Sequence, residues 1–328
     1  MIGFLLRRFA WFLITLWVVV TVSFVLMRSV RGGPFDGERS HHPSIERNIK
    51  ARYHLDWPLS KQYLQYIGPF NLDDHGPEIL GGDGTRPFGG VLTGDLGPSF
   101  KYRDFRVNDI IAQSLPISIA LGTVALSWAL LLGLATGVAS ALRRGSGLDL
   151  TMRLAATAGI ALPNFVIAGF LIIGLVFWWG LFPVAGWGTL SHLMLPGFAL
   201  GAPFAAYIAR LTRTGMLEVL SQDFIRTAHA KGLPPHTVLL RHALKGGILP
   251  VVSYLGPATA GILTGSLVIE KIFAIPGTGT HFVNSALNRD YTLSMGVTIL
   301  YTVLVYSLNT IVDMAYTLLD PRIKLEEV

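Results

Sequence analysis

Long runs without charged residues alternate with short polar segments along this chain. Five windows contain no Asp, Glu, Lys or Arg, namely residues 9–27, 110–142, 154–209, 246–269 and 291–312. A membrane-spanning helix needs about 20 apolar residues, and each window has at least about that length. The third window holds 56 residues. As one helix it would be roughly 84 Å long, far more than a hydrocarbon core of ~30 Å, so we expect it to fold back.

The turn of this third window is visible in the stretch LFPVAGWGTLSHLMLP, residues 181–196. Pro183, Gly186, Gly188 and Pro196 interrupt the apolar run, and Trp187 suits a membrane interface. The pattern therefore predicts an all-α integral membrane protein with six transmembrane helices. The predicted spans are residues 9–27, 114–142, 154–180, 193–211, 247–270 and 291–316.

Composition and charge agree with a bilayer protein. Charged residues make up 14% of the chain and the mean hydropathy is +0.52, whereas soluble domains carry roughly 25% charge. The net charge of +6 does not indicate nucleic-acid binding, because the cations lie at the ends of apolar runs rather than on one face or arm. Cysteine is absent, which excludes disulfides, thiol nucleophiles and cysteine metal sites.

The distribution of cations predicts the orientation in the membrane, because cytoplasmic loops are enriched in Lys and Arg. If both termini are cytoplasmic, the short outer segments hold Arg289 and, at a span end, Lys271. The inner segments then hold Arg7, Arg8, Arg143, Arg144, Arg153, Arg210, Arg213, Arg226, Lys231, Arg241, Lys245, Arg322 and Lys324. The first apolar run is too long for the 7–15 residues of a signal-peptide core, and no small-x-small cleavage site precedes Arg28, so we favour an uncleaved first span over a signal peptide.

Residues 28–109 form the long outer, periplasmic segment of this topology. Within it Ile45, Ile49 and Tyr53, and then Tyr63 and Tyr66, recur at helical spacing on either side of a DWP interruption. We therefore expect a small helical cap, with an exposed glycine-rich loop at LGGDGTRPFGG. The stretch 69–90 has no interpretation from its sequence.

Small residues and prolines inside the spans predict close helix packing and kinks. The pairs Gly133/Gly137, Gly197/Gly201 and Gly261/Gly265 are four residues apart, which lets helix backbones approach closely in lipid. This favours a packing role over a gating role. Kinks or freed backbone groups are expected at three prolines, which are Pro163, Pro203 and Pro257.

Motifs of enzymes and of coupled carriers are missing. The sequence has no H-E-x-x-H, no G-x-S-x-G and no phosphate loop. Glu270 and Asp313 lie at span ends, whereas proton- or sodium-coupled carriers place ionisable groups deep in the bundle. We therefore predict a chain that is neither an enzyme nor a metal protein, and one that needs no cofactor of its own.

A short polar helix is expected between the fourth and fifth spans, in the cytoplasmic segment 212–246. Ser221 or Asp223 can cap its start, Gly232 can take the left-handed position after its end, and the following Pro-Pro stops it. Ala228 and Gly232 form a small, smooth face, and a second short amphipathic helix follows in HTVLLRHALKGG. Entry into a groove on a partner protein and anchoring at lipid headgroups are equally compatible with this pattern. The candidate residues are Asp223, Phe224, Arg226, Thr227, Ala228, Lys231, Gly232 and Pro234.

The outer loop between the fifth and sixth spans is a second candidate site. In AIPGTGTHFVNSALNRDY a turn is followed by a helical pattern whose apolar face comprises Phe282, Val283, Ala286 and Leu287. Such a face needs a partner, which is either an external protein or the outer ends of the chain's own spans. The candidate residues are Gly277, Gly279, Phe282, Asn284 and Asn288.

The stretch from FIRTAHAKGLPP through NSALNRDYT resembles the signature region of permease subunits of binding-protein-dependent ABC importers. With GDLGPSFKYRD, ARLTRTGMLEVL and LDPRIKL elsewhere, the chain is most similar to the first membrane subunits of oligopeptide permeases, in the dipeptide, oligopeptide and nickel branch. Arg226 and Thr227 stand where the family pattern has Glu and its first Ala, so the resemblance does not predict a glutamate-mediated contact. The proline at position 250, Pro250, lies further along the chain from Gly232 than the corresponding proline does in the pattern of the wider family.

This resemblance implies a type I ABC importer permease fold in the bacterial inner membrane. It also implies four kinds of partner: a homologous second permease subunit, two cytoplasmic ATPase subunits that bind ATP and Mg²⁺, a periplasmic or lipid-anchored peptide-binding protein, and membrane lipid. The expected function is ATP-driven oligopeptide import, with residues 223–234 coupling to the ATPases and the outer loop contacting the binding protein. Related importers of dipeptides, nickel or another solute are the alternatives, and a secondary carrier is the alternative of a different class.

Overall fold

The computed structural model describes residues 2–29, 53–68, 90–102, 105–265 and 267–319. Helices dominate these residues, and the one β-type contact among them is an isolated bridge between Pro98 and Arg106. The all-α prediction is therefore confirmed. The predicted helix around Ile45 and Ile49, most of the glycine-rich loop, and the C-terminal LDPRIKL stretch lie outside the described residues.

The chain divides into two compact units, and each is described by itself. The first unit comprises Met1–Phe4, Ser118–Ile275 and Leu304–Val328, and the second comprises Leu5–Ile117 and Pro276–Val303. Three of the four unit boundaries fall within long helices, which are α1 (Ile2–Ser29), α4 (Val107–Leu142) and α14 (Tyr291–Leu319), and the fourth follows Ile275 between α12 and α13.

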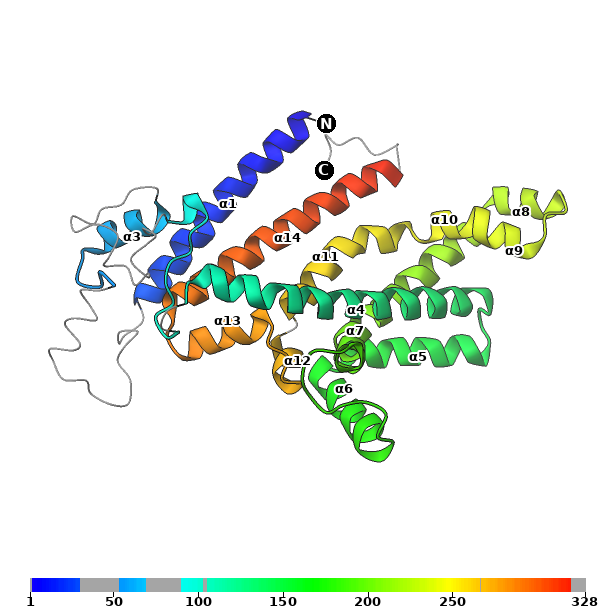
Figure 1. The fold of residues 1–328 in the computed structure, drawn as a ribbon. Coiled ribbons are helices and arrows are strands. Elements are labelled where there is room, and N and C mark those ends of the chain that lie inside the picture. Colours follow the sequence, from blue (N-terminus) through cyan, green and yellow to red (C-terminus); the bar gives the residue numbers. More distant parts are fainter. Residues whose placement is uncertain (1, 30–52, 69–89, 103–104, 266, 320–328) are drawn as a thin grey trace. The chain divides into compact units, whose positions relative to one another are not determined.

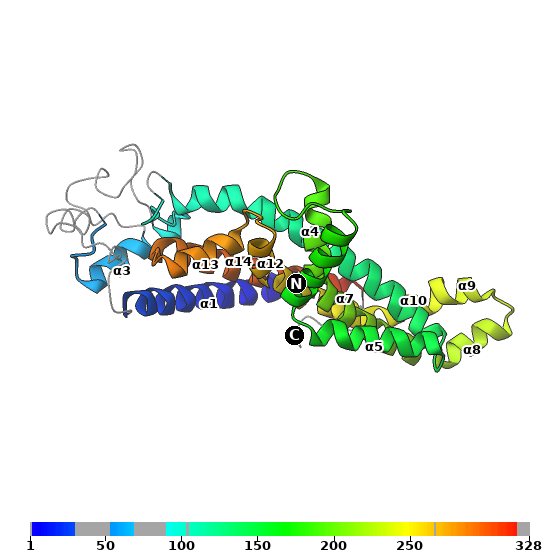
Figure 2. The same ribbon diagram turned by 90° about the horizontal axis from the view of Figure 1, so that it is seen from below.

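Helix α7 (Leu190–Leu220) is the central element of the first unit, because α5, α6, α10 and α11 all contact it (Figures 1 and 2). Helices α8 and α9 lie side by side at one end of this unit (Figure 2). The remaining elements of the unit are α5 (Gly147–Ala161), α6 (Asn164–Leu171), the π-helix η3 (Ile172–Trp178), α8 (Asp223–Ala230), α9 (Pro235–Thr237), the π-helix η4 (Val238–Ala243), α10 (Leu244–Gly247), α11 (Leu249–Gly265) and α12 (Leu267–Ile272).

Among the described residues, five helical stretches are long and apolar enough to cross a membrane, and a bent pair makes a sixth if it is one span. The bent pair is α5 with α6 and η3, whose axes differ by 111°. Its break lies at Leu162, which is extended because the following Pro163 disfavours a helical conformation there. Five to six apolar spans agree with the prediction of six, and the kink predicted at Pro163 is confirmed. The third helix starts at Gly147 rather than at residue 154.

Helix α7 is longer than the predicted fourth span at both ends. The stretch expected to form the turn, residues 181–196, overlapped the predicted span 193–211; the helix begins at Leu190 and contains both Pro196 and Pro203. Neighbouring helices can satisfy the backbone carbonyls that a proline frees, so an internal proline need not end a membrane helix. At the other end α7 continues to Leu220, so the first residues of the predicted cytoplasmic segment 212–246 are helical.

Four glycines bring α4 and α7 into close contact. A Cβ atom at Gly133 would lie 2.6 Å from Ile208, and one at Gly137 would lie 2.5 Å from Thr212. From the other side, a Cβ atom at Gly201 would lie 2.4 Å from the backbone oxygen of Ala125. A Cβ atom at Gly197 would similarly meet α4. The predicted packing role is confirmed for these two glycine pairs.

The second unit combines α1 with α3 (Leu59–Ile67), η2 (Val91–Thr93) and α13 (Thr278–Leu287). Tyr63 and Tyr66, which the periodicity placed on one face, pack against Phe24 of α1. Asp290 is fully buried at the start of α14, where its carboxylate accepts hydrogen bonds from Ser99 and from the Phe100 amide. This carboxylate fastens the segment before α4 to the turn between α13 and α14.

Candidate functional site

Helix α8 follows α7 after two residues, and its N-cap is Gln222, whose side chain makes no capping hydrogen bond. The predicted caps are therefore wrong. The Ser221 hydroxyl instead donates to the Glu218 carbonyl at 2.7 Å, which completes the end of α7. Asp223 is the first helical residue, and its carboxylate lies 3.3 Å from the Arg226 guanidinium.

The end of α8 has the predicted geometry. Gly232 has a φ of +77°, and its amide donates to the His229 carbonyl at 2.9 Å. The Leu233 amide then donates to the Ala228 carbonyl at 3.3 Å, so the chain reverses directly after the helix. No heavy atom lies within 4 Å of a Cβ placed on Gly232. The requirement for glycine is therefore conformational rather than steric.

The inner face of α8 packs on the first unit. Ile225 and Ala228 are 3% and 6% exposed, and they belong to one apolar cluster with Met216 of α7 and with Val238 and Ala243 of η4. The prediction that Ala228 contributes to a small outward face with Gly232 is therefore wrong. An eight-residue helix has one apolar stripe, and here that stripe holds α8 to its own chain.

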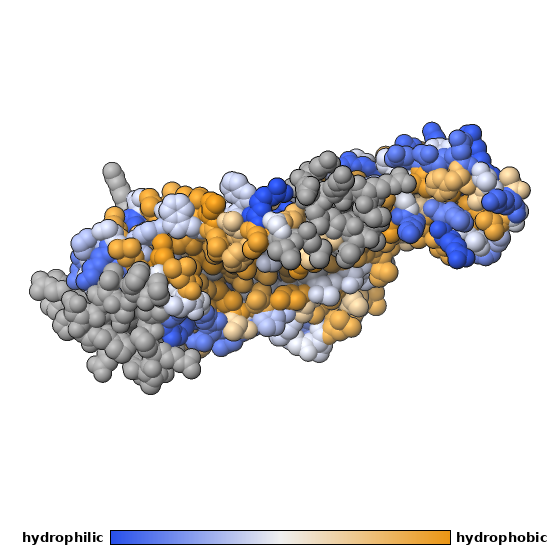
Figure 3. All heavy atoms as spheres, turned by 90° about the horizontal axis from the view of Figure 1, so that it is seen from above, coloured by the Kyte–Doolittle hydropathy of each residue, from blue (hydrophilic) through white to orange (hydrophobic). Residues whose placement is uncertain are grey.

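The outer face of α8 carries the other predicted residues. We call it the α8 surface and define it by the exposed residues Asp223, Phe224, Arg226, Thr227, Lys231, Gly232 and Pro234. Phe224 is 51% exposed among polar neighbours. The side chains of Asp223 and Arg226 are 93% and 77% exposed, so their ion pair contributes little to stability. Hydrophilic side chains gather at this end (Figure 3).

The predicted second amphipathic helix exists as a continuous helical run through α9, η4 and α10. Its middle part has π-helical hydrogen bonding, which inserts an extra residue into a helical turn. Val238 and Ala243 face the cluster beneath α8, whereas Arg241 and Lys245 are exposed. The two short helices therefore share one apolar core.

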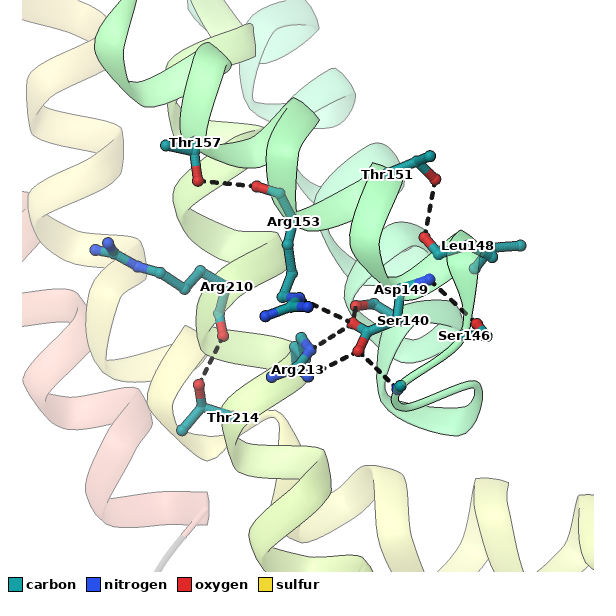
Figure 4. Close-up of polar contacts among 11 residues, drawn as sticks. Ser140, Ser146, Leu148, Asp149, Thr151, Arg153, Thr157, Arg210, Arg213 and Thr214 are labelled. Atoms are coloured by element: carbon teal, nitrogen blue, oxygen red, sulfur yellow. Dashed lines mark hydrogen bonds and ion pairs between the residues drawn. The ribbon is translucent and has the colours of Figure 1, made fainter.

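A buried carboxylate fastens the helices behind this core (Figure 4). Asp149, on the first turn of α5, is 1% exposed. Its two oxygens accept hydrogen bonds from Arg213 Nε at 2.8 Å and Arg213 Nη2 at 3.0 Å. The Ser140 hydroxyl donates at 2.6 Å and the Gly145 amide at 3.0 Å. Charge-assisted, bidentate bonds of this kind are the strong ones, and they join α4, α5 and α7.

Sequence reasoning missed this Asp149 cluster. The hydroxyl of Ser146 caps α5 by accepting from the Asp149 amide at 3.3 Å, and a Ser followed three residues later by an acid is a recognisable helix start. That signal identifies Asp149 as a helix-start residue. It does not reveal the partner Arg213, which is 64 residues away.

The second group of predicted residues lies on α13 and at its start. Gly277 is the N-cap, and Gly279 is buried. Phe282 packs edge-to-face on Tyr301, 5.9 Å between ring centroids. Asn284 is half-buried and Asn288 is exposed. Of the predicted apolar face, Phe282 packs inward, while Ala286 and Leu287 are exposed, Leu287 at 71%. Helix α13 belongs to the second unit and the α8 surface to the first, and each is described by itself.

No group of three or more His, Asp or Glu side chains that could hold a metal ion occurs among the described residues.

Comparisons with known proteins agree with this architecture. Residues 129–325, more than half of the chain, match the family model described as "Binding-protein-dependent transport system inner membrane component". The oligopeptide transport system permease protein OppB of Escherichia coli K12 is 43% identical over 328 residues, covering 99% of this chain and 100% of that protein. The dipeptide transport system permease protein DppB of Bacillus subtilis is 42% identical, covering 100% and 99%.

A solved structure is similar in fold. It is a crystal structure of an amino acid ABC transporter with histidines, matched with a TM-score of 0.51 and 15% sequence identity over 64% of this chain and 94% of that chain. At this level of identity the likeness concerns the fold.

Proposed function

The chain belongs to the family of inner membrane components of binding-protein-dependent transport systems, and on that premise we propose that it is the transmembrane permease subunit of an ATP-driven oligopeptide importer. The observation that carries the proposal is 43% identity over the whole length to the Escherichia coli oligopeptide permease protein. In this function the chain forms half of the translocation pathway and has no catalytic site of its own.

A dipeptide importer is the second candidate, because the Bacillus subtilis dipeptide permease protein is 42% identical over the same length. The small difference between 43% and 42% does not separate the two substrate classes. Import of nickel or another small solute, and secondary transport, find less support in these relatives.

The α8 surface is the proposed contact with the ATPases. Its support is a solvent-facing Phe224 among charged residues, on a helix that is fixed to its own chain by Ile225 and Ala228. A rigid element of this kind can transmit the movement of a partner to α4 and α7. The ATPase subunits, rather than this chain, bind ATP and Mg²⁺ in this proposal.

The exposed residues of α13 are the proposed contact with a peptide-binding protein outside the membrane. Ala286, Leu287 and Asn288 are accessible at the end of this helix, and exposed apolar side chains next to polar ones suit a protein contact. The alternative is that α13 serves to pack on its own unit through Phe282. A second, homologous permease subunit completes the proposed assembly, with both termini of this chain in the cytoplasm of a bacterial cell.

Uptake in proteoliposomes tests the function. The chain is reconstituted with its second permease, the ATPases and the binding protein, and labelled peptides are supplied on the binding-protein side. We expect uptake to require ATP on the opposite side of the membrane. We also expect unlabelled oligopeptides to compete with the labelled peptide more strongly than dipeptides or nickel do. Uptake driven by an ion gradient without ATP would show a secondary carrier instead.

A further inference from the structure

Two arginines at the ends of the longest charge-free window line one pocket. The window 154–209 starts directly after Arg153 and ends directly before Arg210. Because this stretch folds back through the bend at Pro163 and the turn before α7, its two ends return to the same end of the first unit. Both arginines line a pocket of about 570 Å³ between α4, α5 and α7.

Asp149, the nearby acid, does not occupy the hydrogen-bond donors of either arginine. Asp149 already receives hydrogen bonds from Arg213, Ser140 and the Gly145 amide. Arg153 reaches it only through Nε at 3.5 Å, an ion-pair distance without a hydrogen bond in the described structure, and its side chain is 52% exposed. The one carboxylate therefore pairs with two guanidinium groups, those of Arg213 and Arg153, and the stronger contacts belong to Arg213.

Arg210 has no carboxylate within ion-pair distance among the described residues. Its guanidinium lies over the Tyr207 ring, 4.7 Å from the centroid, and its side chain points away from Asp149 in Figure 4. An aromatic face orients a guanidinium while its N–H donors stay available. Planar donors of this kind suit the oxygens of a phosphate.

The rest of the pocket wall is mainly apolar. Leu150, Leu154 and Ile160 line it along α5. The hydroxyls of Thr157 and Thr214 donate to backbone carbonyls of their own helices, so the two arginines are the main free donors. The pocket therefore has guanidinium groups at one part of its wall and hydrocarbon side chains of α5 along the rest.

We propose that this pocket binds an anionic phospholipid, with the phosphate between Arg153 and Arg210 and the start of an acyl chain along α5. Basic pockets between membrane helices at headgroup depth recognise anionic lipids. A volume of about 570 Å³ suits a headgroup with part of one chain. A peptide's carboxylate shares the anionic chemistry, but the hydrocarbon wall and the location at both ends of an apolar window favour the lipid.

Native mass spectrometry of the full-length chain with its co-purifying subunits tests the proposal. The probes are phosphatidylglycerol, which is anionic, and phosphatidylcholine, which has no net charge. The pocket variant is Arg153→Gln with Arg210→Gln; Arg213 stays intact because it holds Asp149. The matched control is Arg143→Gln with Arg144→Gln, which removes two exposed cations from the neighbouring turn after α4.

We expect one phosphatidylglycerol to bind the wild type in preference to phosphatidylcholine. The pocket variant should bind it roughly 30-fold more weakly, since each cation near the surface contributes about 1 kcal/mol, and the control should differ from wild type by less than about threefold. Equal losses in both variants would show general attraction to the basic end and would overturn the proposal.

A competition arm separates lipid from peptide. Trialanine with a free carboxylate and trialanine amide are each added to the lipid-bound complex. If neither displaces phosphatidylglycerol, the lipid assignment stands. If the free acid displaces it and the amide does not, the pocket belongs to the peptide and the lipid assignment is wrong.

Discussion

The left-handed backbone conformation of Gly232 limits which residues can occupy this position of the α8 surface. At its φ of +77° a β-branched side chain costs about 1–2 kcal/mol, although the space around it is open. We predict that Gly232→Val reduces peptide-stimulated ATPase activity of the assembled complex while membrane insertion stays normal. Gly232→Asn should retain most of the activity, because asparagine tolerates this conformation. Full activity of the valine variant would argue that the α8 surface serves only as a headgroup anchor.

Asp149 and Asp223 form a natural pair for comparing buried and exposed ion pairs. Asp149 is 1% exposed and bonded to three partners, whereas the Asp223 side chain is 93% exposed. We predict that Asp149→Asn lowers the thermal unfolding temperature of the purified protein by several degrees, because Arg213 loses its counter-charge. Asp223→Asn should leave it unchanged. Similar melting temperatures for both variants would contradict the anchoring role of Asp149.

Sequence reasoning at the residue scale succeeded where the signal is local. Gly232 before Leu233 and two prolines defines a helix stop from four neighbouring letters. It failed for Ala228, since periodicity shows that an apolar stripe exists without showing which neighbour covers it. It also failed for Asp149, whose partner Arg213 lies on another helix. Distances along the chain carry no information about such a pair.

The contact between α4 and α7 belongs to the scale of elements. A methyl group at Gly201 would meet the Ala125 carbonyl, so the helices would have to separate. We predict that Gly201→Ala destabilises the protein by about 1–3 kcal/mol, as overpacking does. Gly169→Ala on α6 is the control, because nothing lies within 4 Å of its Cβ position. Equal unfolding profiles for the two variants would mean that α4 and α7 can separate at little cost.

Helix α13 offers a test of the proposed docking of a binding protein. The chain has no native cysteine, so Asn284→Cys and Asn288→Cys carry single thiols on the side away from Phe282. We predict that a thiol reagent labels both in the resting complex and that the peptide-loaded binding protein, added with an ATP analogue, protects them. Packing on the chain's own helices does not depend on the binding protein. Identical labelling with and without it would therefore favour the packing role.

The elements themselves were largely predictable, because apolar length is a strong signal in a bilayer. The bend of the third span was foreseen from Pro163, yet Pro196, which was counted among the residues that interrupt the apolar run, lies inside α7. Both residues are prolines in apolar surroundings. What differs is whether packed neighbours support the helix across the proline, and the sequence does not contain that information.

The proposed topology of the whole molecule rests on the distribution of its cations and can be tested with the same cysteine-free background. We predict that an impermeant thiol reagent labels Leu92→Cys in intact spheroplasts and labels Ala230→Cys only after the membrane is opened. Both side chains are exposed in their own units. The physical reason is the retention of Lys and Arg on the cytoplasmic side during insertion. Labelling of Ala230→Cys from outside would invert the proposed orientation.

The Asp149 cluster also has a consequence for the order of biosynthesis. Ser140, Gly145 and Ser146 are synthesised before Asp149, so its hydroxyl and amide partners exist when the carboxylate leaves the ribosome. Arg213 follows 64 residues later, roughly 3–13 s at 5–20 residues per second. During that interval α5, α6 and η3 are synthesised, and of the cluster only Ser140, Gly145 and Ser146 are present to contact Asp149. Insertion of α7 then brings Arg213 to Asp149 and completes the cluster. The growing chain therefore gains this bidentate contact only when the fourth apolar segment has been synthesised.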